Sequence, residues 1–134
     1  MTSTPADFSL AYSAAARQRA ERALRCSPFR LPLLGAMDSQ SIPLSAIAGQ
    51  AGLQQGYVVQ ALGEGRVERE FMWLIQVGLL RREVDGQGIT DQFRLTPLGK
   101  QILSQWQGQG QDWPRPTWWE RLQNQLRRWF SFSL

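Results

Sequence analysis

The amino-acid sequence predicts a mainly α-helical fold with a small antiparallel β-hairpin. Apolar residues recur at helical spacing in several stretches of the chain, and they alternate on either side of the turn-rich run DGQG at 85–88. The chain has 134 residues, of which 43% are hydrophobic, and this is enough for one core and too much for a disordered chain. We therefore expect one domain with tails.

The N-terminal part of the chain is predicted to form a helix at 9–25, after a disordered segment at 1–8. The apolar stripe of this helix has a residue at every fourth position, namely Phe8, Tyr12, Ala16, Ala20 and Leu24. Pro28 is expected to end the helix. Because three prolines lie within 28–43, this segment is predicted to be an irregular connector.

The segment 44–62 is predicted to form two short helices joined by a tight turn. Ile47, Ala48 and Ala51 form the apolar face of the first helix. Gly52 is expected to supply the left-handed residue at the corner, and the small Ala48 lets the two helices cross closely. The second helix is expected to begin at Leu53 and to turn three side chains inward, those of Val58, Ala61 and Leu62. This spacing is typical of a helix-turn-helix.

Three further elements are expected before residue 107. A helix at 64–77 is predicted from the spacing of Val67, Phe71, Leu74 and Ile75. A hairpin should follow, with its inward positions at Leu80, Val84, Phe93 and Leu95. Thr96 and Pro97 are typical of a helix start, so a helix at 97–106 is predicted, with Leu98, Ile102 and Trp106 buried.

The C-terminal segment is predicted to be an amphipathic helix at 117–134, joined to the rest of the chain by a polar linker at 107–116. The apolar stripe of this helix contains Trp119, Leu122, Leu126, Trp129 and Phe130. Trp118 and three arginines complete a pattern of aromatic and basic residues. Leaving such an apolar face in water is unfavourable, so the pattern implies a partner surface.

The residue types that the sequence lacks narrow its function. The chain has one cysteine, Cys26, and no histidine, which excludes His/Cys zinc sites and histidine-based catalysis. The carboxylates form no catalytic pair, so we expect a protein that is not an enzyme and that needs no metal or cofactor. The sequence has no apolar run of 18 residues and no leader pattern, which predicts a cytoplasmic protein, with peripheral membrane association as the alternative.

The positive charge is concentrated towards the two ends of the sequence. The formal net charge is +4, and fourteen of the fifteen basic residues are arginine. Residues 1–35 carry +3, residues 36–107 carry −1 and residues 108–134 carry +2. A basic protein suggests an anionic partner, but a strong phosphate binder would usually have its excess charge in the central domain.

The order of elements resembles a winged helix-turn-helix domain over residues 40–106. The segments from Gly78 to Leu80 and from Leu95 to Gly99 are similar to the wing and the following helix of MarR- and PadR-like regulators. The whole chain also resembles a family of short cyanobacterial proteins. The resemblance implies a winged-helix domain at 9–106, flanked by N- and C-terminal helices, that regulates transcription by binding DNA through its second motif helix and its wing.

The resemblance assigns two groups of candidate DNA-binding residues. On the presumed recognition helix these are Gln54, Gln55, Tyr57 and Gln60, and on the wing they are Arg81, Arg82 and Arg94. The sequence departs from the common layout because about nine additional residues separate Val58 from Gly78, and because the presumed recognition helix has no arginine or lysine. Solvated polar surfaces with local ion pairs are the alternative for both groups.

Two further surfaces are candidates for binding a protein partner. On the helix at 64–77, Arg66, Arg69 and Trp73 form a face opposite the apolar stripe, although Trp73 could instead pack beneath a terminal helix. The C-terminal helix is the second surface, and we expect it to dock on a second copy of the chain in a homodimer. An anionic membrane surface and the chain's own domain are the alternatives. Three functions therefore remain: a DNA-binding regulator, a winged-helix adaptor, and a peripheral membrane protein.

Overall fold

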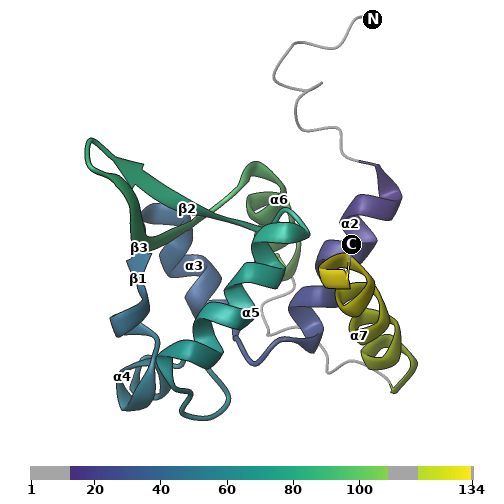
Figure 1. Ribbon diagram of the computed structural model, residues 1–134, viewed down its shortest axis with the longest axis horizontal. Helices are drawn as coiled ribbons and strands as arrows, with labels where there is room; N and C mark the ends of the chain where they lie inside the picture. The colour runs from purple at the N-terminus through teal and green to yellow at the C-terminus, as the bar shows by residue number, and fades with distance from the viewer. Residues whose placement is uncertain (1–12, 109–117, 134) are drawn as a thin grey trace, which may run out of the picture.

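The computed structural model describes residues 13–108 and 118–133, which form six α-helices, a short 3-10 turn and a three-stranded antiparallel sheet (Figure 1). The helices are α2 (Ala14–Cys26), α3 (Leu31–Ser39), α4 (Gly49–Gln54), α5 (Glu64–Gln76), α6 (Pro97–Gln107) and α7 (Trp118–Ser133). The strands are β1 (Ile42–Pro43), β2 (Leu80–Asp85) and β3 (Gly88–Leu95), in the order β1-β3-β2. The predicted fold class is confirmed. The predictions for the segment 1–8, for Phe8 and Tyr12, for most of the linker and for the side chain of Phe130 lie outside the described residues.

Helix α2 ends where the sequence predicts, but the connector after it is not irregular. Within the described residues α2 begins at Ala14, where the Ser13 hydroxyl accepts a hydrogen bond of 3.1 Å from the Ala16 N–H. The segment predicted to be irregular contains α3, so that prediction is wrong. Pro32 stands in the first turn of α3, where a missing N–H removes no helical hydrogen bond. The buried residues of α3 are Leu33, Leu34 and Met37.

The predicted second helix of the helix-turn-helix is absent from 55–63. After α4 the chain is irregular, and Val58 forms an isolated antiparallel bridge with Phe29. Val58 and Leu62 are buried as expected, whereas Ala61 is exposed. Two hydrogen bonds to the segment before α3 hold this run extended, from Arg30 N–H to the Tyr57 carbonyl and from Val59 N–H to the Pro28 carbonyl. These bonds take the place of a helical pattern, and the next helix begins only at Glu64.

Gly52 does not form the predicted left-handed corner. It lies inside α4, and the positive φ angles fall on the glycines at either side, 67° at Gly49 and 75° at Gly56. Gly52 is nevertheless buried against the 3-10 turn (Leu44–Ala46) and its continuation. A Cβ atom at this position would overlap the carbonyl oxygen of Ile47. The glycine is therefore required for close approach of two backbone segments.

The core joins α5 to the sheet and to the segment before α3. Phe71 of α5 lies between Phe29 and Phe93, with ring centroids 4.9 Å and 4.8 Å away. Leu80, Phe93 and Leu95 are buried as predicted, but Val84 is exposed. The pairing of β2 with β3 shifts between Arg82 and Val84, and this irregularity interrupts the inward-outward alternation that placed Val84 inside.

Helix α6 follows the prediction closely. The Thr96 hydroxyl accepts a hydrogen bond of 3.1 Å from the Gly99 N–H, and Pro97 occupies the first turn. Leu98, Ile102 and Trp106 are buried. Helix α6 packs against α3, so the two helices cover the core together.

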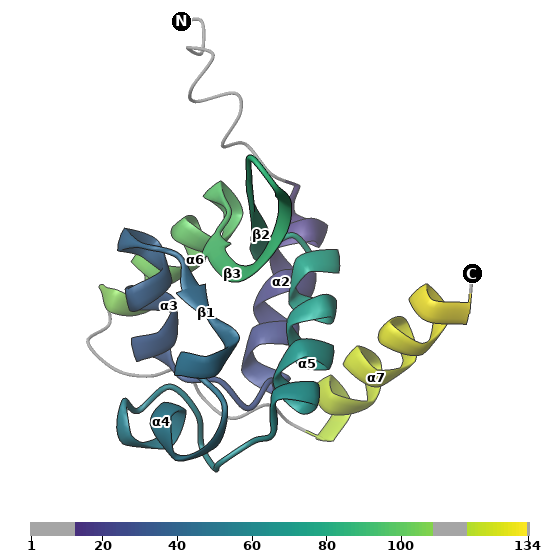
Figure 2. The same ribbon diagram turned by 60° about the vertical axis from the view of Figure 1, so that its left-hand side comes forward.

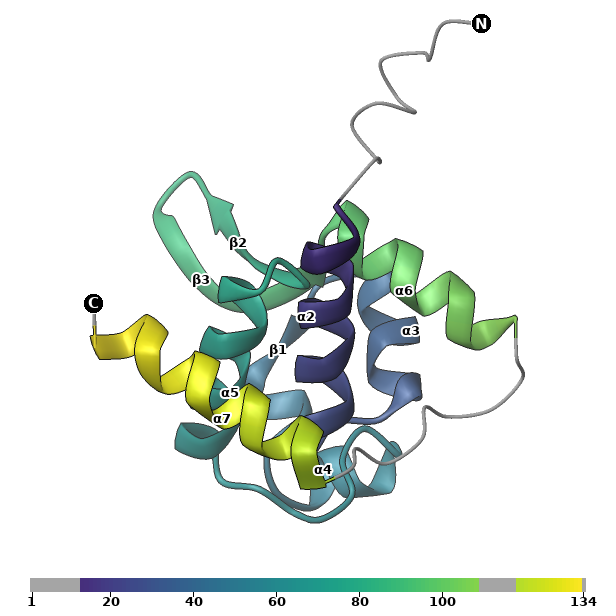
Figure 3. The same ribbon diagram turned by 90° about the vertical axis from the view of Figure 1, so that its right-hand side faces the viewer.

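Helix α7 crosses the outer side of α2 and α5 (Figure 3). Helix α5 lies between the sheet and α7, which places α7 on the side of the molecule away from the hairpin (Figure 1, Figure 2). Among the described residues, 13–108 and 118–133, no helix has the length and apolar character needed to cross a membrane.

Candidate functional site

Helix α7 is fixed to the protein by its polar side. The Trp73 Nε1–H of α5 donates a hydrogen bond of 2.9 Å to the Asn124 side-chain oxygen, and both residues are buried. An amide in this position would be costly to bury without a partner. The bond therefore specifies which side of α7 faces α5.

An ion pair holds the C-terminal half of α7. The Arg128 Nη1 atom lies 3.0 Å and 2.9 Å from the two carboxylate oxygens of Glu70, and Nη2 donates to the Arg69 carbonyl at 3.3 Å. Glu70 is only 8% exposed although it carries a charge. A charge buried to this degree depends on its partner, so Arg128 and Glu70 are coupled parts of the docking contact.

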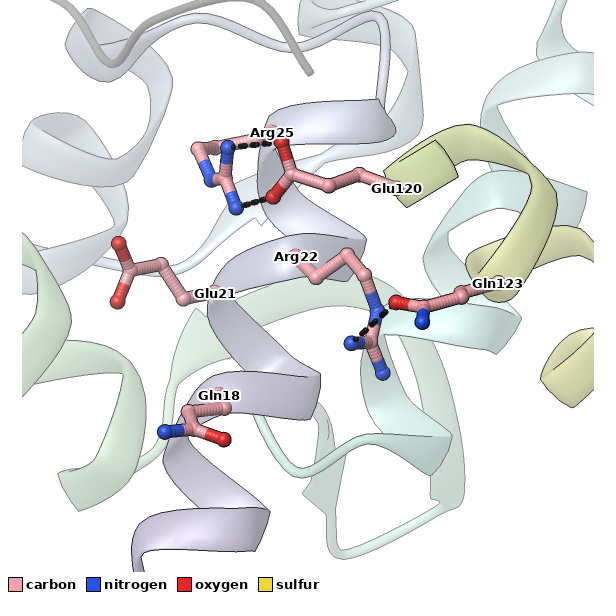
Figure 4. A pocket seen from close by; sticks show the side chains of 6 residues that line it. All are labelled: Gln18, Glu21, Arg22, Arg25, Glu120 and Gln123. Atoms are coloured by element: carbon pink, nitrogen blue, oxygen red, sulfur yellow. Dashed lines mark hydrogen bonds and ion pairs between the residues drawn. The ribbon is translucent and has the colours of Figure 1, made fainter. Parts of the chain in front are cut away.

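Helix α2 holds the N-terminal half of α7 across a polar cleft of about 280 Å³ (Figure 4). Arg25 pairs with both carboxylate oxygens of Glu120, and Arg22 donates to the Gln123 side-chain oxygen at 3.2 Å. Figure 4 shows that Gln18 and Glu21 line the same cleft from α2 without reaching α7. Two helices that are far apart in the sequence thus meet through paired polar side chains.

Cys26 lies at the edge of this contact. Its Sγ atom is 3.7 Å from the Glu120 carbonyl oxygen. Burial raises the pKa of the Cys26 thiol, and the positive charges of Arg25, Arg121 and Arg22 oppose that shift. Burial also lowers the pKa of the Arg22 guanidinium, with Arg127 as the second cause. The half-buried thiol is therefore a natural reporter of whether α7 is docked.

The apolar side of α7 points away from the protein. Trp118, Trp119 and Trp129 are 68%, 64% and 67% exposed, and Leu122 and Leu126 are also exposed. The rings of Trp118 and Trp119 meet edge to face at 4.9 Å. We call these five residues the aromatic face. Their exposed surface is roughly 600 Å², since a tryptophan side chain offers up to about 250 Å². This is as large as the largest apolar patch of a typical monomer.

The structure corrects one candidate partner-binding residue and locates the others. Trp73, which the sequence left either exposed or covered, is 3% exposed and lies beneath α7. Arg66 and Arg69 are exposed on α5. The prediction that the stripe of α7 lies against protein does not hold within the chain itself, and its burial on a second copy remains a prediction.

The candidate DNA-binding residues are divided between two parts of the fold. Gln54, Gln55 and Gln60 are exposed and Tyr57 is half-buried, but they lie on the end of α4 and the irregular run after it, and no recognition helix presents them. The candidate arginines lie on another element, the β2–β3 hairpin, near its base and away from its turn. Figure 1 and Figure 3 show the hairpin and α4 as separate parts of the fold.

The arginines of the hairpin are engaged with carboxylates. Arg81 and Arg94 both pair with Glu83, at 3.7 Å and 3.5 Å. Arg82 pairs with Glu68 of α5 at 3.5 Å, and its guanidinium lies 4.7 Å from the centre of the Phe93 ring. A phosphate would have to compete with these carboxylates for each arginine.

Sequence reasoning missed the residues that dock α7. Glu120, Asn124 and Arg128 recur every four residues, so they form a polar stripe at helical spacing. That pattern could have indicated a second contact face, but a polar stripe is more often solvated.

Across 13–108 and 118–133, no group of three or more potential metal-ligating side chains comes together.

The comparison with protein families gives one match. A family model described as Npun_F0494-like matches residues 10–128. No curated protein and no solved structure matches the chain. The matched range begins before α2 and ends at Arg128 within α7, so it includes all of α2 and α5 and the first eleven residues of α7. The chain therefore belongs to the Npun_F0494-like family.

Proposed function

We propose that this chain is a non-enzymatic winged-helix module that acts by binding a partner through the aromatic face of α7. The observation that carries the proposal is the orientation of α7. Its polar side is fixed to α2 and α5 by specific pairs, and this leaves the tryptophans outside. A helix held only by its apolar side would hide these residues, so the docking contacts present them to a partner.

The winged-helix part of the proposal is supported by the order of the elements. Helix α3, strand β1, helix α4, helix α5 and the β2–β3 hairpin follow one another, and α5 directly precedes the hairpin. Helix, short helix, helix and hairpin is the order that the resemblance implies. In this interpretation α5 takes the place of the recognition helix, and the additional residues of the sequence belong to the irregular run at 55–63.

The surface around α5 and the hairpin favours an adaptor over a DNA reader. The exposed charges of α5 are mixed, because Glu64 and Glu68 alternate with Arg66 and Arg69 and offset them, and Glu68 also pairs with Arg82. The opposite side of α5 is covered by α7 through Trp73 and Glu70. Carboxylates on the reading helix repel phosphates, and its covered side is unavailable to a groove.

The proposal predicts that association in a cell extract depends on the aromatic face. We expect the full chain to migrate with larger particles in size-exclusion or sedimentation experiments, and the double variant Trp118→Gln/Trp119→Gln to migrate at its own mass. Loss of two exposed tryptophans removes much of the contact area without touching the core. Met72→Gln, which changes an exposed apolar residue of α5, is the control and should behave like the wild type. Wild-type chain at monomer mass in the extract would contradict the proposal.

DNA binding through the hairpin is the second candidate, favoured by the order of elements and the net charge of +4. It predicts a mobility shift with duplex DNA at about 50 mM salt, where phosphate contacts are strong. Replacing Arg81, Arg82 and Arg94 by alanine should weaken binding to all sequences and flatten the salt dependence. Gln54, Gln55 and Gln60 would supply the selectivity. No shift of wild-type protein at this salt concentration eliminates the candidate.

A further inference from the structure

We infer that the partner of the aromatic face is the surface of an anionic lipid bilayer, on which α7 lies flat while α2 and α5 hold it from the protein side. This inference rests on the proposed function, because it names the partner of the same surface. It is carried by two independent features of the described residues: the kind of side chain that α7 exposes, and the charge that surrounds it.

The exposed side chains suit the boundary between headgroups and acyl chains. Tryptophan is enriched at this boundary because its ring is apolar and its N–H is polar. Trp118 and Trp119 lie at the start of α7 and Trp129 lies near its end, with Leu122 and Leu126 on the same face. From Trp118 to Trp129 the helix rises about 16 Å. An amphipathic helix of this kind binds in the plane of the interface, with its apolar face buried among the lipids.

The positive charge of the protein is concentrated on α7, which carries the aromatic face, and on its neighbour α2. Helices α2 and α7, which lie side by side, contain seven arginines and two glutamates, so together they carry +5. The whole chain carries +4, which leaves −1 for the rest. Arg121 and Arg127 of α7 and Arg19 of α2 are exposed. A basic flank beside an apolar helix face matches the negative potential of anionic headgroups.

The same charge argues against a second copy of the chain as the occupant. A two-fold dimer places the same surface of each protomer against the other. Here that would bring two helix pairs of +5 together, and facing like charges oppose association. An anionic lipid surface carries the opposite charge and has no such disadvantage.

The test uses the full chain and vesicles of two compositions, phosphatidylcholine alone and phosphatidylcholine mixed with phosphatidylglycerol. We expect co-sedimentation and a blue shift of tryptophan fluorescence with the anionic vesicles, and a large loss of binding at 1 M salt, where the screening length is about 3 Å. The Trp118→Gln/Trp119→Gln variant should lose this binding. Binding that is equal on the two compositions and insensitive to salt would overturn the role of the anionic headgroups.

Two charge-reversal variants distinguish an effect of the charge on α7 from an effect of the net charge of the protein. Arg127→Glu changes an exposed residue of α7, and Arg81→Glu makes the same change at an exposed residue of β2, outside α2 and α7. We expect Arg127→Glu to weaken binding to anionic vesicles at least about tenfold, because each basic residue near such a surface contributes about fivefold. Arg81→Glu should bind like the wild type. Equal losses in the two variants would show an effect of net charge and overturn the inference.

The remaining outcomes distinguish this inference from the proposed function. If the wild type ignores anionic vesicles but still associates in an extract through Trp118 and Trp119, the partner is a protein. The lipid inference then fails, and the proposed function stands. A concentration-dependent dimer that the Trp118→Gln/Trp119→Gln variant abolishes would assign the face to a second copy and also overturn the inference. If neither vesicles nor extract engage the face, both fail.

Discussion

Gly52→Val is expected to lower the free energy of unfolding by about 3 kcal/mol or more. Effects of this size are typical of substitutions that the packed interior cannot accommodate. A Cβ atom at Gly52 would overlap the carbonyl oxygen of Ile47, which is backbone and cannot swing away as a side chain could. The Gly52 carbonyl also accepts a hydrogen bond of 2.9 Å from the Tyr57 N–H, so moving Gly52 disturbs the run after α4. Thermal unfolding followed by circular dichroism should show a fall in Tm of about 10 °C.

The matched control is Gly65→Val. Gly65 also lies in a helix, and the nearest atom to its added Cβ would be Arg69 Nη1 at 3.6 Å, an ordinary contact. Valine has a slightly better helix propensity than glycine, so the control should keep or slightly raise Tm. If Gly52→Val unfolds at the same temperature as Gly65→Val, the packing of α4 on the 3-10 turn is wrong.

Gly52 also shows that a sequence pattern can indicate a required glycine without indicating why glycine is required there. The pattern predicts a left-handed glycine at the corner between two helices, whereas the structure has a glycine inside α4 that a close backbone approach requires. A left-handed turn and a close backbone approach both require glycine. The spacing of apolar residues alone does not separate the two, because the segment that approaches Gly52 is positioned by its own turn and by the core.

Helix α3 is not predicted from the sequence because the three prolines of 28–43 are interpreted only as residues that end or prevent a helix. Pro28 does end α2, but Pro32 stands in the first turn of α3, where proline is compatible with a helix. Leu33, Leu34 and Met37 have helical spacing, which could have outweighed the count of prolines. Helix α6 was predicted correctly because Thr96 and Pro97 combine a cap with an N-terminal proline, and this pair has one interpretation.

The candidate surface was found in the sequence, but its orientation was not. Periodicity divides α7 into an apolar and a polar stripe, and it favours burial of the apolar one. Which stripe meets the protein depends on partners that are distant in the sequence, such as Glu70 and Trp73 for Arg128 and Asn124. The hairpin arginines are similar, since Arg82 is paired by Glu68 of another helix. Long-range pairs of this kind leave no local pattern.

Arg128→Glu is expected to release α7 from α5. The substitution places a second carboxylate beside Glu70, which is already largely buried and would lose its only charged partner among the contacts described above. Removing one partner of a buried ion pair costs about 3–5 kcal/mol. Arg127→Glu is the matched control, because Arg127 is the exposed neighbour on the same helix and should leave α7 docked.

The release of α7 can be measured at Cys26 by the rate of alkylation between pH 7 and pH 9. Loss of the contact with α5 is expected to free the whole of α7, including Glu120, from α2 as well. Burial, the largest cause of the raised pKa, is then relieved and outweighs the loss of the smaller, opposing effect of Arg121, so the pKa of the thiol falls in Arg128→Glu. A larger thiolate fraction and better access then both increase the rate.

The exchanged pair Glu70→Arg/Arg128→Glu restores opposite charges and should recover part of the docking energy, which a double-mutant cycle measures. Equal alkylation rates in Arg128→Glu and Arg127→Glu would contradict the role of this ion pair. Slow alkylation of the Glu70→Arg/Arg128→Glu variant would support that role. It would show that opposite charges at positions 70 and 128, and not an arginine at position 128 itself, keep α7 docked with its tryptophans facing outward.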